Sequence, residues 1–408
     1  MYNRLSILYI AYSCSPINGS EDRVGWKICE EAAKLHNVYV LTKAESEKDI
    51  KAYNKNHTLK NIIFYYVDIP SIYKRYFNGI LYSARLNIWH RRAVTVAQQI
   101  CEKNPSITII HQITPVEFRS IGNYASIKGI NFICGPIGGG EYCPKELWQY
   151  IKRNWHIELL RKATNLYYRS LYHLNGRFNS CSCLMLANYE TKEFVGIKDA
   201  LVETELGIDK TNNLKPLNIK NNNSKCVFLV VGRGIYRKGH TFLFDAVKQL
   251  HTNKDYTIKI IGKGKEINKI RKRYNADDSI KRHFIFLGEI PFTEMQKEYR
   301  QADVLIMPSI RETTGSVIFE ALNNGLPVIA MNRFGSGMII NDSIGWTFKG
   351  NTRQEFLDSF SNILKNCIEN PEEIMRKRQN IAFEIKKYTW ETKIQKWTKL
   401  YNSIILHK

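Results

Sequence analysis

Two glutamates with seven residues between them, Glu312 and Glu320, are the side chains whose spacing most directly suggests chemistry. An apolar run from Val304 to Met307 precedes them and predicts a buried strand. From Ser316 onward, apolar residues recur at helical spacing, and Gly325 is a typical helix stop. We therefore expect Glu312 in a strand-to-helix loop and Glu320 on the helix that follows.

This loop and its helix have the features of a nucleotide diphosphate site. Backbone N–H groups from Thr314 to Val317 would point out of the helix N-terminus, which favours an anion. Gly315 leaves room for a phosphate to approach the backbone closely. Glu320, two turns along, is placed to bind the two hydroxyls of a ribose. Glu312 then remains for whatever the diphosphate carries.

Two cations follow another expected strand, Cys226 to Val231. Gly232-Arg233 is followed by Lys238-Gly239, which places Arg233 and Lys238 on one strand-to-helix loop. Arginine presents a planar fork of donors and lysine a point charge, and both suit the negative charge that grows on a departing diphosphate. A lone basic loop is usually only solvated, but we expect this one to act together with the glutamate loop.

Glycine-rich loops stand in the first half of the chain. Gly19-Ser20-Glu21 follows the expected first strand, and Gly135-Pro136-Ile137-Gly138-Gly139-Gly140-Glu141 follows another. Such glycine density lets the backbone approach a ligand closely. His111 ends the strand between them and is either a ligand-facing residue or a hydrogen-bonded structural histidine.

Taken together, these motifs resemble the nucleotide-sugar site of retaining glycosyltransferases of family 4, which have the GT-B fold. The family pattern is Glu-x-Phe-Gly, several apolar residues, Glu-Ala, and then Gly-x-Pro-Val-Ile-Ala, and Thr314 replaces the Phe here. The subgroup with a Gly-Pro-x-Gly-Gly-Gly-Glu loop looks most similar. Many relatives have a histidine where Gly135 stands, and His111 is a candidate to replace part of its function.

The resemblance implies roles for particular residues. Arg233 and Lys238 would hold the diphosphate and Glu312 the sugar hydroxyls, as the catalytic set. The donor would also be bound by Gly19, Gly232, Thr314, Gly315, Ser316, Val317 and Glu320. Residues near the acceptor or the sugar would be His111, Gly138, Gly139 and Glu141. The reaction implied is retaining transfer from a nucleoside-diphosphate sugar, with UDP expected, to a glycan or lipid-linked acceptor in cell-surface polysaccharide synthesis.

We expect neither a metal nor another cofactor. No Asp-x-Asp occurs, and His, Cys and carboxylates show no metal-ligand spacing. Arg233, Lys238 and a helix N-terminus could neutralise the diphosphate in place of a cation. The resemblance also implies front-face attack, in which the leaving phosphate takes the acceptor's proton and no side-chain base is needed.

The formal charge of +22 over 408 residues favours polyanionic partners, unless it only reflects genome composition. Aromatic residues alternate with cations in Lys145 to Arg177 and in Tyr73 to Arg92, which suits either an anionic lipid surface or a core helix with a solvated face. No apolar run is long enough to span a bilayer, no signal peptide is evident, and the nine scattered cysteines fit reduced thiols. We expect a cytoplasmic protein, peripheral on the inner face of the plasma membrane, and no nucleic-acid partner.

Alternating strand-like and helix-like segments predict an α/β protein with two Rossmann-like domains that face a central cleft. The expected bounds are 1–206 for an acceptor domain, 207–388 for a nucleotide-sugar domain, and 389–408 for a helix that returns to the first domain, with a polar linker from Asp209 to Lys225. Two rival interpretations are a nucleotide-sugar epimerase of the same fold and a non-catalytic basic protein that binds membrane or nucleic acid.

Overall fold

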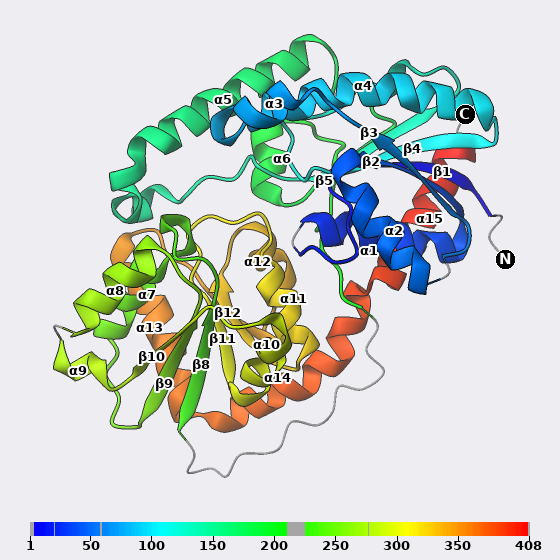
Figure 1. Cartoon of the computed structure of the whole chain (residues 1–408). Coiled ribbons are helices and arrows are strands. Elements are labelled where there is room, and N and C mark those ends of the chain that lie inside the picture. Colours follow the sequence, from blue (N-terminus) through cyan, green and yellow to red (C-terminus); the bar gives the residue numbers. More distant parts are fainter. Residues whose placement is uncertain (1–3, 20, 58, 210–224, 276, 407–408) are drawn as a thin grey trace. The chain divides into compact units, whose positions relative to one another are not determined.

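The computed structural model describes residues 4–19, 21–57, 59–209, 225–275 and 277–406. The chain forms two compact units (Figure 1). Unit 1 comprises residues 1–140, 157–207 and 390–408, and unit 2 comprises residues 141–156 and 208–389. The expected linker lies almost wholly outside the described residues.

Unit 1 contains a seven-stranded parallel sheet with the strand order β3-β2-β1-β4-β5-β6-β7. Its strands are β1 (Ser6–Ala11), β2 (Asn37–Lys43), β3 (Ile62–Val67), β4 (Ile107–Thr114), β5 (Asn131–Ile137), β6 (Cys183–Leu186) and β7 (Leu201–Val202). Every residue of β1 is buried, and its alternate side chains enter two different hydrophobic clusters. Both faces of the sheet are therefore covered, as is usual for a parallel sheet.

The helices of unit 1 cover these two faces (Figure 1). They are α1 (Glu21–Leu35), α2 (Glu47–Asn56), α3 (Ser71–Tyr76), α4 (Tyr82–Lys103), α5 (Trp155–Leu174), α6 (Tyr189–Val195) and α15 (Trp390–Leu406). Asn188 caps α6 by accepting a hydrogen bond from the Thr191 amide at 2.8 Å, a role for which asparagine is favoured at helix N-termini.

Helix α15 follows unit 2 in the chain but packs in unit 1, which confirms the expected return of the C-terminal helix. Trp390, Trp397 and Tyr401 are buried in the same hydrophobic cluster as Tyr9 of β1. A Cβ atom on Gly207 would lie 2.6 Å from the Trp390 ring, so only glycine fits beneath this indole.

Unit 2 contains a six-stranded parallel sheet with the order β10-β9-β8-β11-β12-β13. Its strands are β8 (Cys226–Val231), β9 (Tyr256–Ile261), β10 (Phe284–Gly288), β11 (Val304–Met307), β12 (Val328–Met331) and β13 (Gly345–Phe348). Its helices are α7 (His240–Lys248), α8 (Lys265–Asn275), α9 (Asp278–Lys281), α10 (Phe292–Gln301), α11 (Ser316–Asn323), α12 (Phe334–Ile339), α13 (Arg353–Glu369) and α14 (Pro371–Glu384). The two parallel-sheet α/β domains that we expected are therefore present.

The strand order of unit 2 reverses between β8 and β11, which pair with each other although four α-helices and two strands separate them in sequence. At such a switch point the connections leave in opposite directions, and the crevice beyond the carboxyl ends of the strands binds ligands. The loops that follow β8 and β11 hold the cations and the first glutamate singled out from the sequence.

Residues 141–156 correct the expected domain bounds, because they belong to unit 2 and not to the first domain. Leu147 and Ile151 are buried in the hydrophobic cluster of unit 2. The Tyr150 hydroxyl donates a hydrogen bond to Asp245 at 2.9 Å. The order of the predicted strands and helices could not indicate that residues 141–156 belong to unit 2, because tertiary packing stabilises this short segment.

We predict that unit 1 depends on α15 for its stability. Trp397 is 1% exposed, so Trp397→Ala should lower the free energy of unfolding by about 3–5 kcal/mol. Leu406, on the same helix but 82% exposed, is the matched control, and Leu406→Ala should change it by less than about 0.5 kcal/mol. Denaturant unfolding measures both variants, and equal effects would show that α15 is not part of the folded core.

Candidate functional site

One close backbone approach holds together the two loops of the switch point. Gly239 has a φ of +70°, and a Cβ atom there would lie 1.8 Å from the carbonyl oxygen of Pro308. The amide of Ile310 donates to the carbonyl of Arg237 at 2.9 Å. Main-chain contacts thus hold the loop after β8 against the loop after β11.

Glu312 joins these loops through its carboxylate. Its Oε2 accepts hydrogen bonds from Lys238 Nζ and from Arg237 Nη1, the latter at 3.0 Å, and the side chain is 13% exposed. Burial would raise the pKa of Glu312, but the charges and hydrogen bonds of Lys238 and Arg237 hold it below its usual value. The carboxylate therefore stays ionised and neutralises part of the cationic cluster.

Arg237 is a residue that sequence reasoning missed. It precedes Lys238, and the 3₁₀ turn Tyr236–Lys238 brings both side chains to Glu312. Arg233, which was expected to be the partner of Lys238, is instead exposed, and its side chain makes no ion pair within the described ranges. These three cations exceed the single carboxylate by two positive charges, so the loops can still attract an anion.

The loop after β11 ends at the N-terminus of α11, as the sequence predicts. Gly315 is the N-cap residue with a φ of +96°, a conformation that favours glycine. The first amides of a helix have no acceptor within the helix, so those of Ser316 and Val317 lie where an anion can be bound. Thr314 is fully buried, and a Cβ atom on Gly335 would lie 2.5 Å from its hydroxyl, so only the backbone of Thr314 can serve a ligand.

Glu320 lies on α11, as expected, with a partner that the sequence did not indicate. The Tyr299 hydroxyl, from α10, donates to Glu320 Oε2 at 2.8 Å. Burial and the neighbouring Glu320 charge raise the pKa of Tyr299, so the phenol stays protonated and remains a donor. The second oxygen of Glu320 accepts no hydrogen bond from a residue of the described chain, and it remains a candidate acceptor for ligand hydroxyls.

Glu141 ends the glycine-rich loop and contacts the loop after β11. The Thr313 hydroxyl donates to Glu141 Oε1 at 3.1 Å, and Glu141 is 4% exposed. This contact lies inside unit 2, because residues 141–156 belong to that unit. Glu141, which is far from Glu312 in the sequence, thereby contacts the loop that contains Glu312.

The other glycines of that loop lie in unit 1, where packing accounts for several of them. A Cβ atom on Gly135 would lie 2.1 Å from the Met185 carbonyl oxygen. The carbonyl of Gly138 accepts from the Phe118 amide at 2.9 Å, and that of Gly139 accepts from Arg161 at 2.6 Å and from Asn165 at 2.9 Å. Close packing within unit 1 therefore accounts for Gly135 and for Gly140, where a Cβ atom would lie 2.9 Å from the Thr191 backbone, whereas the carbonyl contacts at positions 138 and 139 do not by themselves require glycine.

Gly19 lies on the surface at the end of the first loop, where an added Cβ atom would meet nothing within 4 Å. Two residues on, Glu21 begins α1 and accepts a hydrogen bond from the Val116 amide, beyond the carboxyl end of β4. Burial raises the pKa of Glu21 to about 7. These residues lie at the switch point between β1 and β4 of unit 1. This position in the sheet corresponds to that of the loops after β8 and β11 in unit 2.

His111 does not occupy the ligand-facing position that we considered. Its side chain is fully buried, Nδ1 is hydrogen bonded to the Tyr401 hydroxyl at 2.7 Å, and Nε2 to the Gly135 carbonyl at 2.7 Å. Burial lowers the pKa of His111 to about 3, so the ring is neutral. The expectation that it lies next to a sugar is therefore contradicted, and its contacts instead join β4, β5 and α15.

The described residues contain neither a candidate metal-ion cluster nor a helix that could span a membrane. No group of three or more His, Cys, Asp or Glu side chains in that part of the chain could hold a metal ion. None of the helices built from those residues is long and apolar enough to cross a membrane.

Comparison with known families gives a match in unit 2. Residues 212–381 match the family model described as glycosyl transferases group 1. This range includes the loops after β8 and β11, so the family pattern covers Arg233, Lys238, Glu312 and Glu320.

Among characterised proteins, the chain is similar to the UDP-Gal:alpha-D-GlcNAc-diphosphoundecaprenol alpha-1,3-galactosyltransferase of Escherichia coli. The two are 30% identical over 157 residues, which are 37% of this chain and 38% of that enzyme. The matched segments span 36–42% of the length of the first three curated relatives.

Solved structures match over nearly the whole chain. The lipopolysaccharide outer core galactosyltransferase WaaB aligns with a TM-score of 0.65 and 17% identity over 99% of both chains. Anabaena HepE, in complex with UDP and glucose, aligns with a TM-score of 0.62 and 14% identity over 98% of this chain and 100% of that one. The fold is therefore the GT-B fold of these glycosyltransferases.

We predict that the Gly239 contact positions the cationic loop. Gly239→Ala should destabilise the protein by more than about 3 kcal/mol, because it adds a backbone clash to the strain of a positive φ. Gly288, with a φ of +72° and open space around it, is the matched control, and Gly288→Ala should cost only about 1 kcal/mol. Chemical denaturation compares them, and similar losses would exclude the clash as the cause.

Proposed function

We propose that this protein is a retaining glycosyltransferase that moves a sugar from a nucleoside-diphosphate sugar to a glycan or lipid-linked acceptor in cell-surface polysaccharide synthesis. UDP is the expected nucleotide. The observation that supports this most strongly is the cluster of Arg237, Lys238 and Glu312 beside the N-terminus of α11, at the switch point of unit 2. The group 1 match over the same loops favours transfer over epimerisation.

In the proposed donor complex, the diphosphate binds Arg233, Lys238 and the first amides of α11. Arg237 is added to this set, because its guanidinium shares Glu312 with Lys238. The surplus of positive charge is suited to a diphosphate, whose charge increases as the sugar leaves. Glu320 binds the ribose hydroxyls with the oxygen that Tyr299 does not occupy. No metal or other cofactor is assigned to this site.

Glu312 has two tasks in this proposal. Before the donor binds, it neutralises Lys238 and Arg237; once a diphosphate takes over these cations, its carboxylate is released to the sugar hydroxyls. The bond between C1 of the sugar and the phosphate oxygen then breaks, and the acceptor oxygen bonds to C1 on the same face. The departing diphosphate takes the proton of the acceptor hydroxyl, so no side-chain base is required.

The acceptor class is proposed from similarity and from surface chemistry. The Escherichia coli relative is named for a sugar linked to diphosphoundecaprenol, which is a lipid-linked acceptor. In this chain, the buried residues of α5 are Glu158, Asn165 and Tyr172, whereas its exposed residues are largely apolar. The exposed apolar side chains of its unit 1 part are Ile157, Leu159, Leu160, Leu166, Tyr167 and Leu174.

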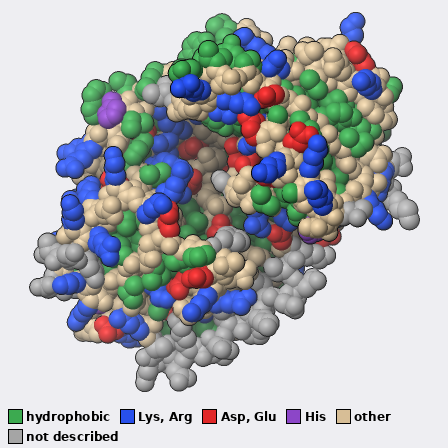
Figure 2. All heavy atoms as spheres, in the orientation of Figure 1, with side chains coloured by type: hydrophobic (Ala, Val, Ile, Leu, Met, Phe, Trp, Pro, Cys, Tyr) green, Lys and Arg blue, Asp and Glu red, His purple; other side chains and the backbone are tan. Residues whose placement is uncertain are grey.

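This outward apolar face supports attachment to an anionic membrane surface, and we propose a cytoplasmic enzyme on the inner face of the plasma membrane. The inner face of α5 is partly polar, because Asn165 and Arg161 donate to the Gly139 carbonyl, whereas Tyr172 packs in the hydrophobic cluster of unit 1. Figure 2 shows hydrophobic side chains beside cations along the upper edge, where Figure 1 places α5. Lys and Arg side chains are otherwise spread over much of the visible face, without the single stripe typical of a nucleic-acid groove.

The roles of the two glutamates can be separated by substitution. Glu320→Gln should weaken UDP and the UDP-sugar alike, because the ribose is common to both, by at most about 3 kcal/mol. Glu312→Gln should leave UDP affinity unchanged or higher, because Lys238 and Arg237 lose a competing carboxylate. Sugar transfer should fall at least about 100-fold.

Calorimetry with UDP and turnover with a radiolabelled UDP-sugar measure both quantities on the same variants. Other nucleoside diphosphates are screened first by thermal shift, so that an incorrect nucleotide is recognised. A Glu312→Gln protein that lost UDP affinity as strongly as Glu320→Gln would refute the assignment of roles. Absence of any nucleotide binding or transfer would refute the proposed function.

Transfer should not require a metal ion, because the cations of the loop after β8 can neutralise the diphosphate. We expect activity after exhaustive EDTA treatment to stay within about threefold of the untreated enzyme. The same assay with added magnesium or manganese is the control. Loss of activity that either ion restores would contradict a metal-independent reaction.

Membrane attachment should depend on the outer face of α5. Changing Leu159 and Leu166, which are 57% and 42% exposed, to Ser should reduce binding to phosphatidylglycerol vesicles at least about tenfold. Phe383→Ser, at a 76% exposed position of unit 2, should leave binding unchanged. Sedimentation at low and high salt measures the effect, and equal binding of all variants would show that α5 is not the attachment site.

A further inference from the structure

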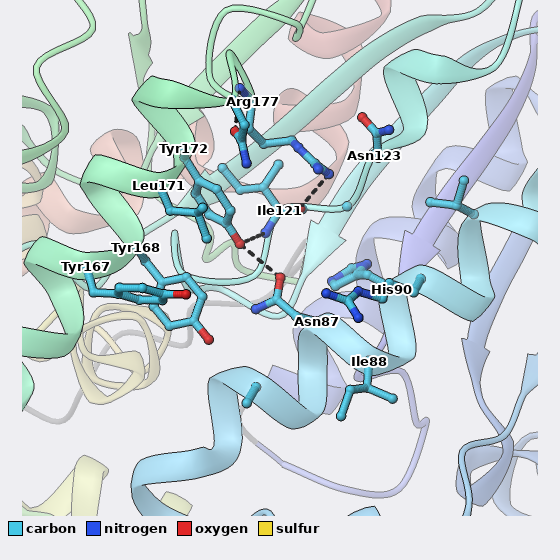
Figure 3. A pocket seen from close by; sticks show the side chains of 15 residues that line it. Asn87, Ile88, His90, Ile121, Asn123, Tyr167, Tyr168, Leu171, Tyr172 and Arg177 are labelled. Atoms are coloured by element: carbon cyan, nitrogen blue, oxygen red, sulfur yellow. Dashed lines mark hydrogen bonds between the residues drawn. The ribbon is translucent and has the colours of Figure 1, made fainter.

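A cavity of about 530 Å³ lies within unit 1, apart from the loops of the candidate donor site. Figure 3 shows it between α4, which contributes Asn87 and His90, and α5, which contributes Tyr167 and Tyr168. The chain around Ile121 forms the third wall. Nothing in the proposed transfer reaction uses this cavity.

The charged side chains that line the cavity are all positive. Two guanidinium groups, those of Arg91 and Arg177, line it, and no Asp or Glu is among its lining residues. Arg177 donates from Nη1 to the Ile121 carbonyl at 3.2 Å, and its guanidinium has no second acceptor within the described ranges. Arg91 is exposed and forms no ion pair with any described residue. This pair of uncompensated cations favours an anion, and guanidinium groups bind phosphate in a bidentate manner.

The remaining walls are mainly apolar and continue to the molecular surface. Ile88 and Val94 of α4 line the cavity together with Leu171 and Tyr168 of α5. Tyr167 also lines the cavity and is 63% exposed, so it belongs both to the cavity and to the outward apolar face of α5. A ligand with a charged head and an apolar chain could therefore place the head inside and the chain along α5.

A buried polar atom of His90 lies at the wall of this cavity. His90 lines the cavity and is 2% exposed, and its Nδ1 is hydrogen bonded to the Tyr124 hydroxyl at 2.8 Å. Its Nε2 is buried and has no hydrogen-bond partner in the described part of the chain. Burial lowers the pKa of His90 to about 3, so the ring is neutral and adds a hydrogen-bonding atom without adding charge. Such an unpaired buried group is normally satisfied in proteins, and a bound polar group would satisfy it.

We propose that this cavity binds one molecule of a phosphate-bearing lipid. The phosphate contacts Arg91 and Arg177, a polar group of the headgroup reaches His90, and the chain lies against Leu171 and Tyr167. A free phosphate would satisfy the two arginines but leave the apolar walls uncovered, which is why we assign a lipid. The site is separate from the donor loops, so it can bind lipid whether or not the proposed transfer reaction is correct.

Dihexanoyl phosphatidylglycerol, used as a monomer below its micelle-forming concentration, is the probe for the full-length protein. We expect calorimetry to give saturable binding of one molecule. Arg91→Gln and Tyr167→Ala should each weaken it at least about tenfold, because both side chains are exposed and line the cavity. Arg92→Gln removes the same charge from the next position of α4, outside the cavity, and should leave binding unchanged.

Two soluble ligands test whether binding requires both a charged head and an apolar chain, and one variant tests whether the ligand binds in the cavity. Dihexanoyl phosphatidylcholine, with no net charge, and inorganic phosphate, with no chain, should both bind at least about tenfold more weakly. Asn123→Trp, at an exposed position that lines the cavity, should obstruct it without altering charge. Equal affinity for inorganic phosphate would refute a lipid site. Absence of saturable binding, or equal losses in Arg92→Gln and Arg91→Gln, would refute the cavity as the site.

Discussion

The shared carboxylate of Glu312 is the interaction on which the candidate donor site depends. It neutralises two cations of the preceding loop while the backbone contact between Gly239 and Pro308 keeps both loops in place. Without Glu312, two partly buried like charges would lie side by side, which is costly. The carboxylate thus occupies the position that an incoming anion would take, and the cations are oriented before a ligand arrives. A site arranged in advance loses less entropy on binding.

The sequence predicted the framework of this site because local patterns determine it. Apolar runs mark β8 and β11 with the bounds that the structure has, and parallel strands bring their carboxyl ends to one edge. Arg237 was missed because neighbouring residues rarely contact one target, and its contact with Glu312 depends on the conformation of the turn Tyr236–Lys238. Tyr299 was missed because its contact with Glu320 joins two helices whose packing no local pattern specifies.

Long-range packing also explains the incorrect expectations. His111 is of a residue type, and at a position near the end of a predicted strand, that suit a ligand-facing residue. However, α15, which follows it by almost three hundred positions, covers it and provides the Tyr401 hydroxyl. The aromatic and cationic pattern of α5 was recognisable, yet the face turned inward could not be derived from it. Polar residues on the inner face depart from the usual rule for surface helices, and here Arg161 and Asn165 bind the Gly139 carbonyl while Tyr172 packs in the hydrophobic cluster.

The position of α15 has a consequence for biosynthesis. Unit 1 begins at the start of the described chain, but its last helix is translated only after all of Ile208–Thr389 has been made. At about 5–20 residues per second, this delay is roughly 10–40 seconds for a segment of that length. During this time Tyr9 and His111 lack the helix that buries them, while unit 2 can already fold on its own sheet. The nascent first unit is therefore the part of the chain that chaperones would have to protect.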